Sequence, residues 1–198
     1  AKFNLKALSI RGPHFIFHFQ CINMKNTSLI LLSLFILVSC QENTIPSNFK
    51  KLLSQHKYTL VMFLAPDCPL CHTLSTPFSK LNEKYPNMQG IGIISGNYYS
   101  AMEINHFATE TAFKPAIFRD ISYQIARQLN ATVTPEFYIL DSTGNILYQG
   151  MMDDRIERLG SYKQQWKNNY LEDAILSVSN NLKPKIERTT PIGCSLEY

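Results

Sequence analysis

The fold of this protein is decided by the stretch YTLVMFLAPDCPLC at residues 58–71. Residues 58–64 form a nearly continuous apolar run, which is typical of a strand buried on both faces of a sheet. A helical pattern begins directly after this run, and it carries Cys68 and Cys71 on its first turn. Residues three apart share one face of a helix, so the two sulfur atoms can close a short ring. The stretch therefore predicts a redox pair of thiols at the start of a helix.

The place of the pair on the helix predicts which thiol is the more reactive. Cys68 lies against the unpaired backbone N–H groups and the positive end of the helix dipole, which favour its thiolate. Cys71 lies one turn further in. We therefore expect Cys68 to be the more exposed thiol and to have the lower pKa.

The hydrophobic periodicity of the remaining sequence alternates between strand and helix patterns. Residues 141–144 are typical of the tight turn of a hairpin. This order predicts an α/β domain over residues 49–182, with three layers and a mixed central sheet covered by helices on both faces. The expected helices are 45–56, 69–85, 102–111, 121–129 and 162–182, and the expected strands are 58–64, 90–94, 136–140 and 145–150.

The first 39 residues have the pattern of a leader. Residues 24–39 combine a basic start with an apolar run too short to span a bilayer, as in a secretory signal peptide. The final Leu-Val-Ser-Cys resembles the lipobox of bacterial lipoproteins, which implies that Cys40 is lipidated and anchors the protein to a membrane. Residues 40–48 then form a tether. Residues 1–23 are either an upstream artefact of the gene model or an acid-poor organellar presequence; a buried core helix is the alternative for residues 24–39.

The composition supports a near-neutral domain without a nucleic-acid surface. Four of the 19 basic residues fall within residues 1–39, which leaves 15 against 15 acidic residues. A balanced charge gives no indication of the strongly basic face that nucleic-acid binding needs. The five cysteines are too few for a disulfide-stapled scaffold, so their spacing carries the information.

The order of the elements, with Cys-x-x-Cys after the first central strand and Thr134-Pro135 before the hairpin, resembles the thioredoxin superfamily. The long segment 95–133 is similar to its exported redoxin branch, the thiol-specific antioxidant-like and membrane-anchored thioredoxin-like proteins. The resemblance implies that Cys68 is the nucleophile, Cys71 the resolving thiol and Pro135 a cis-proline beside them. The backbone of Thr134 is then expected to pair with an incoming peptide strand.

Three positions depart from the pattern of thioredoxins, and one of them is the helix proline, Pro77, which falls one residue later than usual. Asp67 replaces the tryptophan before the first cysteine, and a carboxylate there opposes the formation of the Cys68 thiolate. Met62 stands where thioredoxins have a buried acid, so the strand offers no proton acceptor for Cys71. These departures affect the redox potential and leave the fold prediction unchanged.

Four other functions compete with thiol–disulfide exchange. Cys68 to His72 is also a C-x-x-C-H motif, as in c-type haem attachment. A peroxiredoxin-like thiol peroxidase needs a hydroxyl three residues before its reactive cysteine, where this chain has Ala65. A zinc site lacks a second ligand pair at metal spacing. The thioredoxin-like domain can also serve as a non-catalytic binding module with a static disulfide.

The sequence thus predicts an exported thiol–disulfide oxidoreductase without a cofactor in the bacterial cell envelope, as a periplasmic-side or outer-membrane lipoprotein. Its expected partners are exported proteins with thiols or disulfides and a membrane thiol carrier, which restores the dithiol after each turnover. Cys194 lies in the tail, residues 183–198, and is left without an obvious partner. Two interpretations stay open: an inert or free thiol, or an extra resolving cysteine carried by the tail.

Overall fold

A computed structural model describes residues 45–198. The predicted leader, the lipidation of Cys40 and the first part of the tether lie outside the described residues. In the described part of the chain, no helix combines the length and the apolar composition needed to cross a bilayer.

A mixed five-stranded sheet forms the centre of the domain, in the order β3-β2-β1-β5-β6. The first three strands are parallel, and β5 runs antiparallel to its neighbours β1 and β6. Side chains of β1 alternate between the two faces: Leu60 and Met62 enter one core cluster, while Val61 and Phe63 enter the other. The strands are β1 (Tyr58–Phe63), β2 (Gln89–Ser95), β3 (Ala116–Asp120), β5 (Glu136–Asp141) and β6 (Ile146–Gly150).

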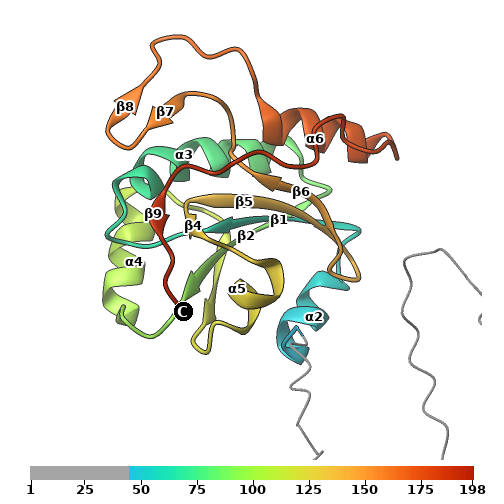
Figure 1. The fold of residues 1–198 in the computed structure, drawn as a ribbon. Helices are drawn as coiled ribbons and strands as arrows, with labels where there is room; N and C mark the ends of the chain where they lie inside the picture. Colours follow the sequence, from blue (N-terminus) through green and yellow to red (C-terminus); the bar gives the residue numbers. More distant parts are fainter. Residues whose placement is uncertain (1–44) are drawn as a thin grey trace, which may run out of the picture. The chain divides into compact units, whose positions relative to one another are not determined.

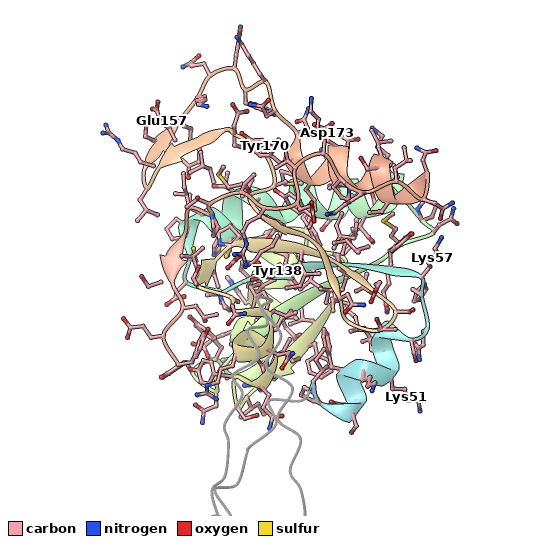
Figure 2. The ribbon with its side chains drawn as sticks, turned by 45° about the vertical axis from the view of Figure 1, so that its right-hand side comes forward. Lys51, Lys57, Tyr138, Glu157, Tyr170 and Asp173 are labelled. Carbon is pink, nitrogen blue, oxygen red and sulfur yellow. The ribbon has the colours of Figure 1, made fainter. Side chains whose placement is uncertain are left out.

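Helices cover both faces of this sheet (Figure 1). Apolar residues of α3 (Pro69–Lys84), α4 (Ala101–Glu110) and α6 (Tyr170–Ser179) fill one core cluster. Those of α2 (Ser47–Leu53) and α5 (Gln124–Leu129) fill the other. Figure 2 shows the ring of Tyr138 within the domain, while the labelled charged side chains lie around its periphery. The predicted α/β fold with a mixed sheet between two helical layers is confirmed.

Three element predictions were wrong. Residues 116–120 form the edge strand β3, which the sequence analysis did not predict, and the helix expected at 121–129 begins only at Gln124. The helix expected at 162–182 is only α6, and Trp166 is exposed in the loop before it. The first helix is also shorter than expected, because it spans only Ser47–Leu53.

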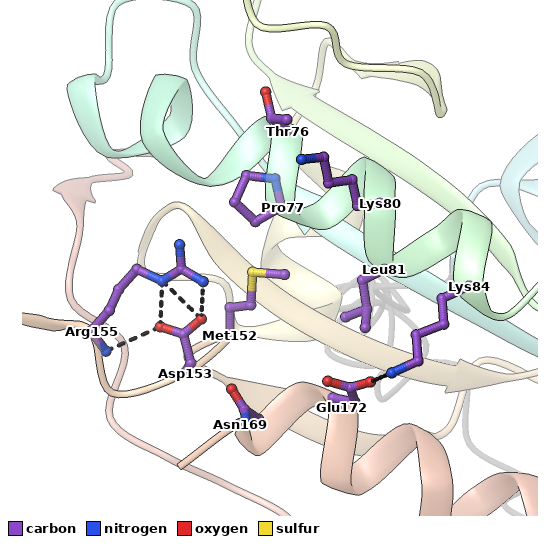
Figure 3. A pocket seen from close by; sticks show the side chains of 10 residues that line it. All are labelled: Thr76, Pro77, Lys80, Leu81, Lys84, Met152, Asp153, Arg155, Asn169 and Glu172. Atoms are coloured by element: carbon purple, nitrogen blue, oxygen red, sulfur yellow. Dashed lines mark hydrogen bonds and ion pairs between the residues drawn. The ribbon is translucent and has the colours of Figure 1, made fainter. Parts of the chain in front are cut away.

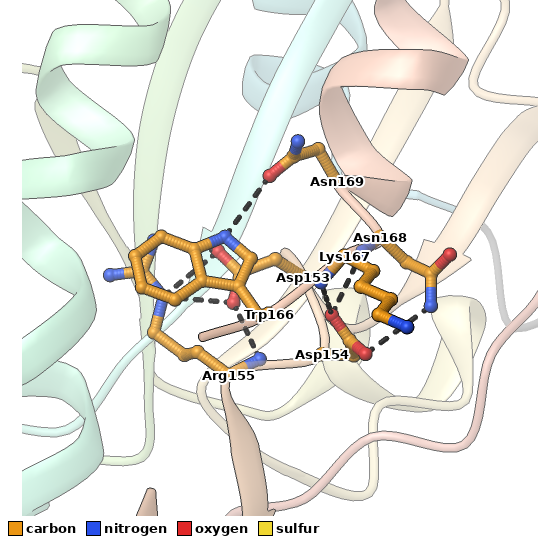
Figure 4. A network of polar contacts seen from close by, with 7 residues as sticks. All are labelled: Asp153, Asp154, Arg155, Trp166, Lys167, Asn168 and Asn169. Atoms are coloured by element: carbon orange, nitrogen blue, oxygen red, sulfur yellow. Dashed lines mark hydrogen bonds and ion pairs between the residues drawn. The ribbon is translucent and has the colours of Figure 1, made fainter. Parts of the chain in front are cut away.

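The loop before α6 is irregular because two aspartates hold it (Figure 4). Asp154 accepts hydrogen bonds from the backbone N–H groups of Lys167 and Asn168. Asp153 forms an ion pair with Arg155 at 2.7 Å, and the guanidinium of Arg155 lies over the ring of Trp166 at 4.4 Å. These contacts take the N–H groups that an earlier helix would need. The loop also contains a short hairpin, β7 (Ile156–Arg158) and β8 (Ser161–Tyr162).

The C-terminal tail returns to the domain as a strand. After α6 it runs back across the molecule and ends as β9 (Cys194–Ser195) beside β4 (Val133–Thr134) (Figure 1). The two strands pair antiparallel, with Cys194 opposite Thr134. The tail therefore reaches the residue that precedes Pro135, where the sequence analysis placed the redox site.

Candidate redox site

The end of β1 positions the two cysteines of the motif. The N–H of Leu64 donates to the carbonyl of Ile93 on β2, and this bond holds the chain just beyond the end of the central strand β1. A turn follows, in which the N–H of Cys68 donates to the carbonyl of Ala65 at 3.1 Å. Cys68 is the N-cap of α3 with an extended backbone, and Pro69 occupies the first helical turn, where proline is favoured. The predicted strand and helix start are confirmed.

Cys71 lies one turn further along α3 and is completely buried. The N–H of Ala65 donates to its sulfur at 3.4 Å. Burial raises the pKa of the Cys71 thiol well above its ordinary value, and the neighbouring Cys68 sulfur raises it further by hydrogen bonding and by charge. At neutral pH, Cys71 is therefore a protonated thiol.

Cys68 is buried as well: 1% of its surface is exposed, against 0% for Cys71, so the expected difference in exposure is slight. The C-terminal tail covers it: the sulfur atoms of Cys68 and Cys194 lie 2.7 Å apart. A position at the start of a helix predicts an exposed thiol, but a segment more than 120 residues away lies over Cys68.

Thr134 and Pro135 stand beside the thiols, as the resemblance implied. The peptide bond between them is cis, which confirms that expectation. The thiol of Cys68 is 3.1 Å from the carbonyl oxygen of Thr134, and this residue is itself buried. The structure thus brings together Cys68, Cys71, Thr134 and Cys194.

The pKa of the Cys68 thiol is lowered from 9.0 to about 5. The main cause is a hydrogen bond from the Cys71 thiol; a further bond from Cys194 and the N–H groups of Cys71 and Leu70 add to it, while burial opposes it. The side chain of Asp67 accepts a hydrogen bond from the hydroxyl of Tyr99. The opposition expected from Asp67 does not prevent the lowering of the pKa.

A pH titration tests this assignment. Because the pKa of Cys68 is lowered to about 5, its thiolate should be present at neutral pH and be lost as the pH falls through 5. The ultraviolet absorbance of the thiolate should show this step in the reduced protein, and Cys68→Ser should remove it. Cys71→Ala should shift the midpoint upward, because it removes the main hydrogen-bond donor. A single thiol step near pH 9 in the unaltered protein would contradict the assignment.

The sequence analysis missed a buried polar network that holds the strand before Pro135. Glu136, fully buried, accepts from the N–H of Thr132 at 2.9 Å and from the side-chain amide of Gln149 at 2.8 Å. The side chain of Gln149 in turn accepts from the guanidinium of Arg188. The network connects β5, β6 and the tail with the residue before β4. A charged residue inside an apolar strand pattern was the only signal of it in the sequence.

One cavity lies between α3 and the start of α6, away from the thiols. It has a volume of about 330 Å³, and four of its five charged side chains are paired, Asp153 with Arg155 and Lys84 with Glu172 (Figure 3). A cavity of about 270 Å³ lies at the thiol site itself, where Ala65, Thr134 and Cys194 are among its lining residues. The second cavity is therefore the one relevant to thiol chemistry.

In the described part of the chain, the contacts of His72 and Ala65 do not favour the alternative functions of the motif. The ring of His72 contacts the carbonyl of Pro66 at 2.7 Å and packs edge-on against Phe107. Within residues 45–198, no three histidine, cysteine or carboxylate side chains form a group suited to a metal ion. Ala65 offers the site its backbone N–H, which Cys71 accepts, and its side chain has no hydroxyl to bind a peroxide.

Comparisons with known proteins agree with this geometry. The family model described as a thioredoxin-like domain matches residues 45–162. Among solved structures, an uncharacterized conserved protein from Geobacillus kaustophilus has a TM-score of 0.62 and 21% identity, over 72% of this chain and 77% of that chain. The hypothetical protein SMc02350 from Sinorhizobium meliloti has a TM-score of 0.58 and 20% identity, over 75% and 83%. No curated protein matches the sequence. At this identity, the two structural likenesses establish the fold alone.

Proposed function

Because this chain belongs to the thioredoxin-like domain family, we propose that it is an exported thiol–disulfide oxidoreductase that exchanges a Cys68–Cys71 dithiol or disulfide with other exported proteins. One observation carries the proposal. The lowered pKa of Cys68 and the raised pKa of Cys71 divide the two roles that disulfide exchange requires, a thiolate that attacks and a thiol held in reserve.

The first step is an attack on the client. The Cys68 thiolate attacks one sulfur of a client disulfide, a bond forms between Cys68 and the client, and the second client sulfur leaves as a thiolate. The carbonyl of Thr134 lies beside Cys68, so the backbone of β4 can align an extended client segment once the tail strand β9, which pairs with it, has moved away. Main-chain pairing of this kind binds a peptide with little dependence on its sequence.

The second step releases the client. Once Cys68 is part of a mixed disulfide, it no longer carries the charge that raises the pKa of Cys71. Burial remains, but the N–H of Ala65 still donates to the Cys71 sulfur and favours its thiolate. Cys71 then attacks Cys68, the Cys68–Cys71 disulfide forms, and the client leaves as a thiol. Two electrons have moved from the protein to the client.

The proposed cellular location is based on the predicted leader. An export signal in residues 24–39 and lipidation at Cys40 place the domain in the bacterial cell envelope, on the periplasmic side or at the outer membrane. A disulfide formed there must be reduced again before another turnover. A membrane thiol carrier is the proposed electron partner, and exported proteins with thiols or disulfides are the proposed clients.

Trapping of a mixed disulfide tests the proposal. The double variant Cys71→Ser, Cys194→Ser leaves Cys68 without a neighbouring thiol, so its bond to a client cannot be resolved. Incubated with insulin, this variant should give a covalent protein–insulin complex on a non-reducing gel, and dithiothreitol should dissolve it. The triple variant that also carries Cys68→Ser is the control. If the double variant forms no more complex than the triple variant, the protein is a static module and the proposal is wrong.

A further inference from the structure

The tail strand β9 lies where the proposed function places a client. It pairs antiparallel with β4, next to the Thr134 carbonyl that faces Cys68. Its Cys194 stands directly opposite Thr134, and the Cys194 sulfur lies 2.7 Å from the Cys68 sulfur. A client disulfide undergoing attack would have to present its sulfur to Cys68 in the same way.

Contacts upstream of Cys194 fix the tail against the sheet. The N–H of Gln149 donates to the carbonyl of Glu187 at 2.9 Å, and the N–H of Thr189 donates to the carbonyl of Gln149 at 3.0 Å. The hydroxyl of Thr189 also accepts from the N–H of Met151 at 2.7 Å. These bonds attach the tail to the edge strand β6 a few residues before the cysteine.

Contacts downstream of Cys194 fix its other side. The N–H of Leu196 donates to the carbonyl of Thr132 at 2.9 Å. The ring of Tyr198 lies 5.9 Å from that of Tyr123, and the guanidinium of Arg127 lies over Tyr198 at 5.4 Å. Cys194 is thus held from both sides, and its approach to Cys68 is specified by the structure around it.

Gly193 shows how closely the two backbones approach. A Cβ atom built on Gly193 would lie 2.4 Å from the carbonyl oxygen of Thr134. Only glycine allows the strand to lie this close to β4 at the position next to Cys194. The glycine before Cys194 therefore permits the close backbone approach that brings Cys194 to the site.

We propose that Cys194 is a third redox cysteine, carried by a built-in strand that occupies the client position and forms an internal disulfide with Cys68. The inference rests on the proposed function, because the Cys68–Cys71 disulfide that it consumes is the product of client reduction. In this proposal, the tail is an internal substrate that competes with clients for Cys68.

The exchange is balanced in atoms and electrons. The partly exposed Cys194 thiol, whose pKa is raised to about 12 by burial and by the neighbouring Cys68, gives its proton to solvent as it attacks the Cys68 sulfur. The Cys68–Cys194 bond forms, the Cys68–Cys71 bond breaks, and the electron pair goes to Cys71. Cys71 then takes up a proton, which its buried position favours. No outside oxidant is consumed. Cys194 is only partly buried, so the exchange moves the disulfide from a sealed pair to one that a thiol reductant can reach.

Disulfide mapping tests this pairing. Cys71→Ser is incubated with oxidised glutathione, blocked with N-ethylmaleimide and digested with trypsin, which should give a fragment at residues 58–80 with Cys68 and one at 189–198 with Cys194. We expect the two fragments to be joined by a disulfide. Cys71→Ser, Cys194→Ser should instead retain glutathione on Cys68. Separate fragments carrying glutathione or the blocking group in Cys71→Ser would overturn the proposal.

A second measurement separates this inference from the proposed function. In Cys71→Ser, Cys194 can still resolve the bond between Cys68 and insulin, so this variant should retain at least about tenfold less complex than Cys71→Ser, Cys194→Ser, because an intramolecular thiol has a millimolar effective concentration. Cys71→Ser, Ser195→Ala keeps Cys194 and should behave like Cys71→Ser. Equal trapping in both would overturn the inference and leave the proposed function standing. Joined fragments without any insulin complex would overturn the proposed function and support the inference.

Discussion

Replacing Cys68 with serine should lower the rate of insulin reduction, with dithiothreitol as the electron source, by at least about a thousandfold. Serine at this position has no accessible anion near neutral pH, and removal of a nucleophile commonly costs this much or more. The loss should appear in the turnover rate at saturating insulin, because the chemical step itself is removed. A coupled turbidity assay of the precipitating insulin chains measures it.

A matched control separates lost chemistry from lost folding. Thr73→Ser changes an exposed side chain on the same helix, and it should leave both turnover and thermal unfolding close to those of the unaltered protein. Cys68→Ser should unfold at a similar temperature and still lack activity. If Cys68→Ser retained a substantial part of the rate, the nucleophile would have to be assigned elsewhere.

Gly193→Ala should make Cys68 react with iodoacetamide about 5 to 150 times faster than in the unaltered reduced protein. The added Cβ would lie 2.4 Å from the Thr134 carbonyl, so the strand must move away and uncover the thiol. Overpacking of this kind costs roughly 1–3 kcal/mol, and each 1.36 kcal/mol changes an equilibrium constant tenfold. The rate is read from the mass of the alkylated tryptic fragment at residues 58–80.

Ser195→Ala is the control for this effect, because Ser195 is exposed on the same strand and its change adds no atom toward β4. Its alkylation rate should match that of the unaltered protein. Far-ultraviolet circular dichroism should be the same for both variants, since the tail contributes little regular structure. An unchanged alkylation rate in Gly193→Ala would mean that the tail does not control access to Cys68.

The sequence by itself determined the central part of the fold. Strand β1 is buried on both faces and α3 has one apolar stripe, so each carries a strong periodic pattern within a few residues. The thiol pair could also be predicted, because the spacing of Cys68 and Cys71 is a pattern contained within four residues. The hairpin of β5 and β6 was readable from its turn, where the N–H of Gly144 donates to the carbonyl of Asp141.

Local patterns failed where distant contacts decide the structure. Strand β3 is only partly buried, and it is defined by backbone pairing with β2 rather than by an apolar pattern of its own. The start of α6 is delayed because Asp154 captures backbone N–H groups thirteen and fourteen residues away. A local sequence pattern contains no information about either effect, because both depend on residues outside the segment that forms the helix or strand.

The role open to Cys194 was decided by the tertiary structure alone. In the sequence it is one cysteine in an irregular tail, 126 residues from Cys68. The structure brings the two sulfur atoms together because Thr189 is held by β6, Gly193 allows close approach to Thr134, and Leu196 pairs with Thr132. Each of these contacts crosses a large separation in the chain, and together they fix a register that no local pattern encodes.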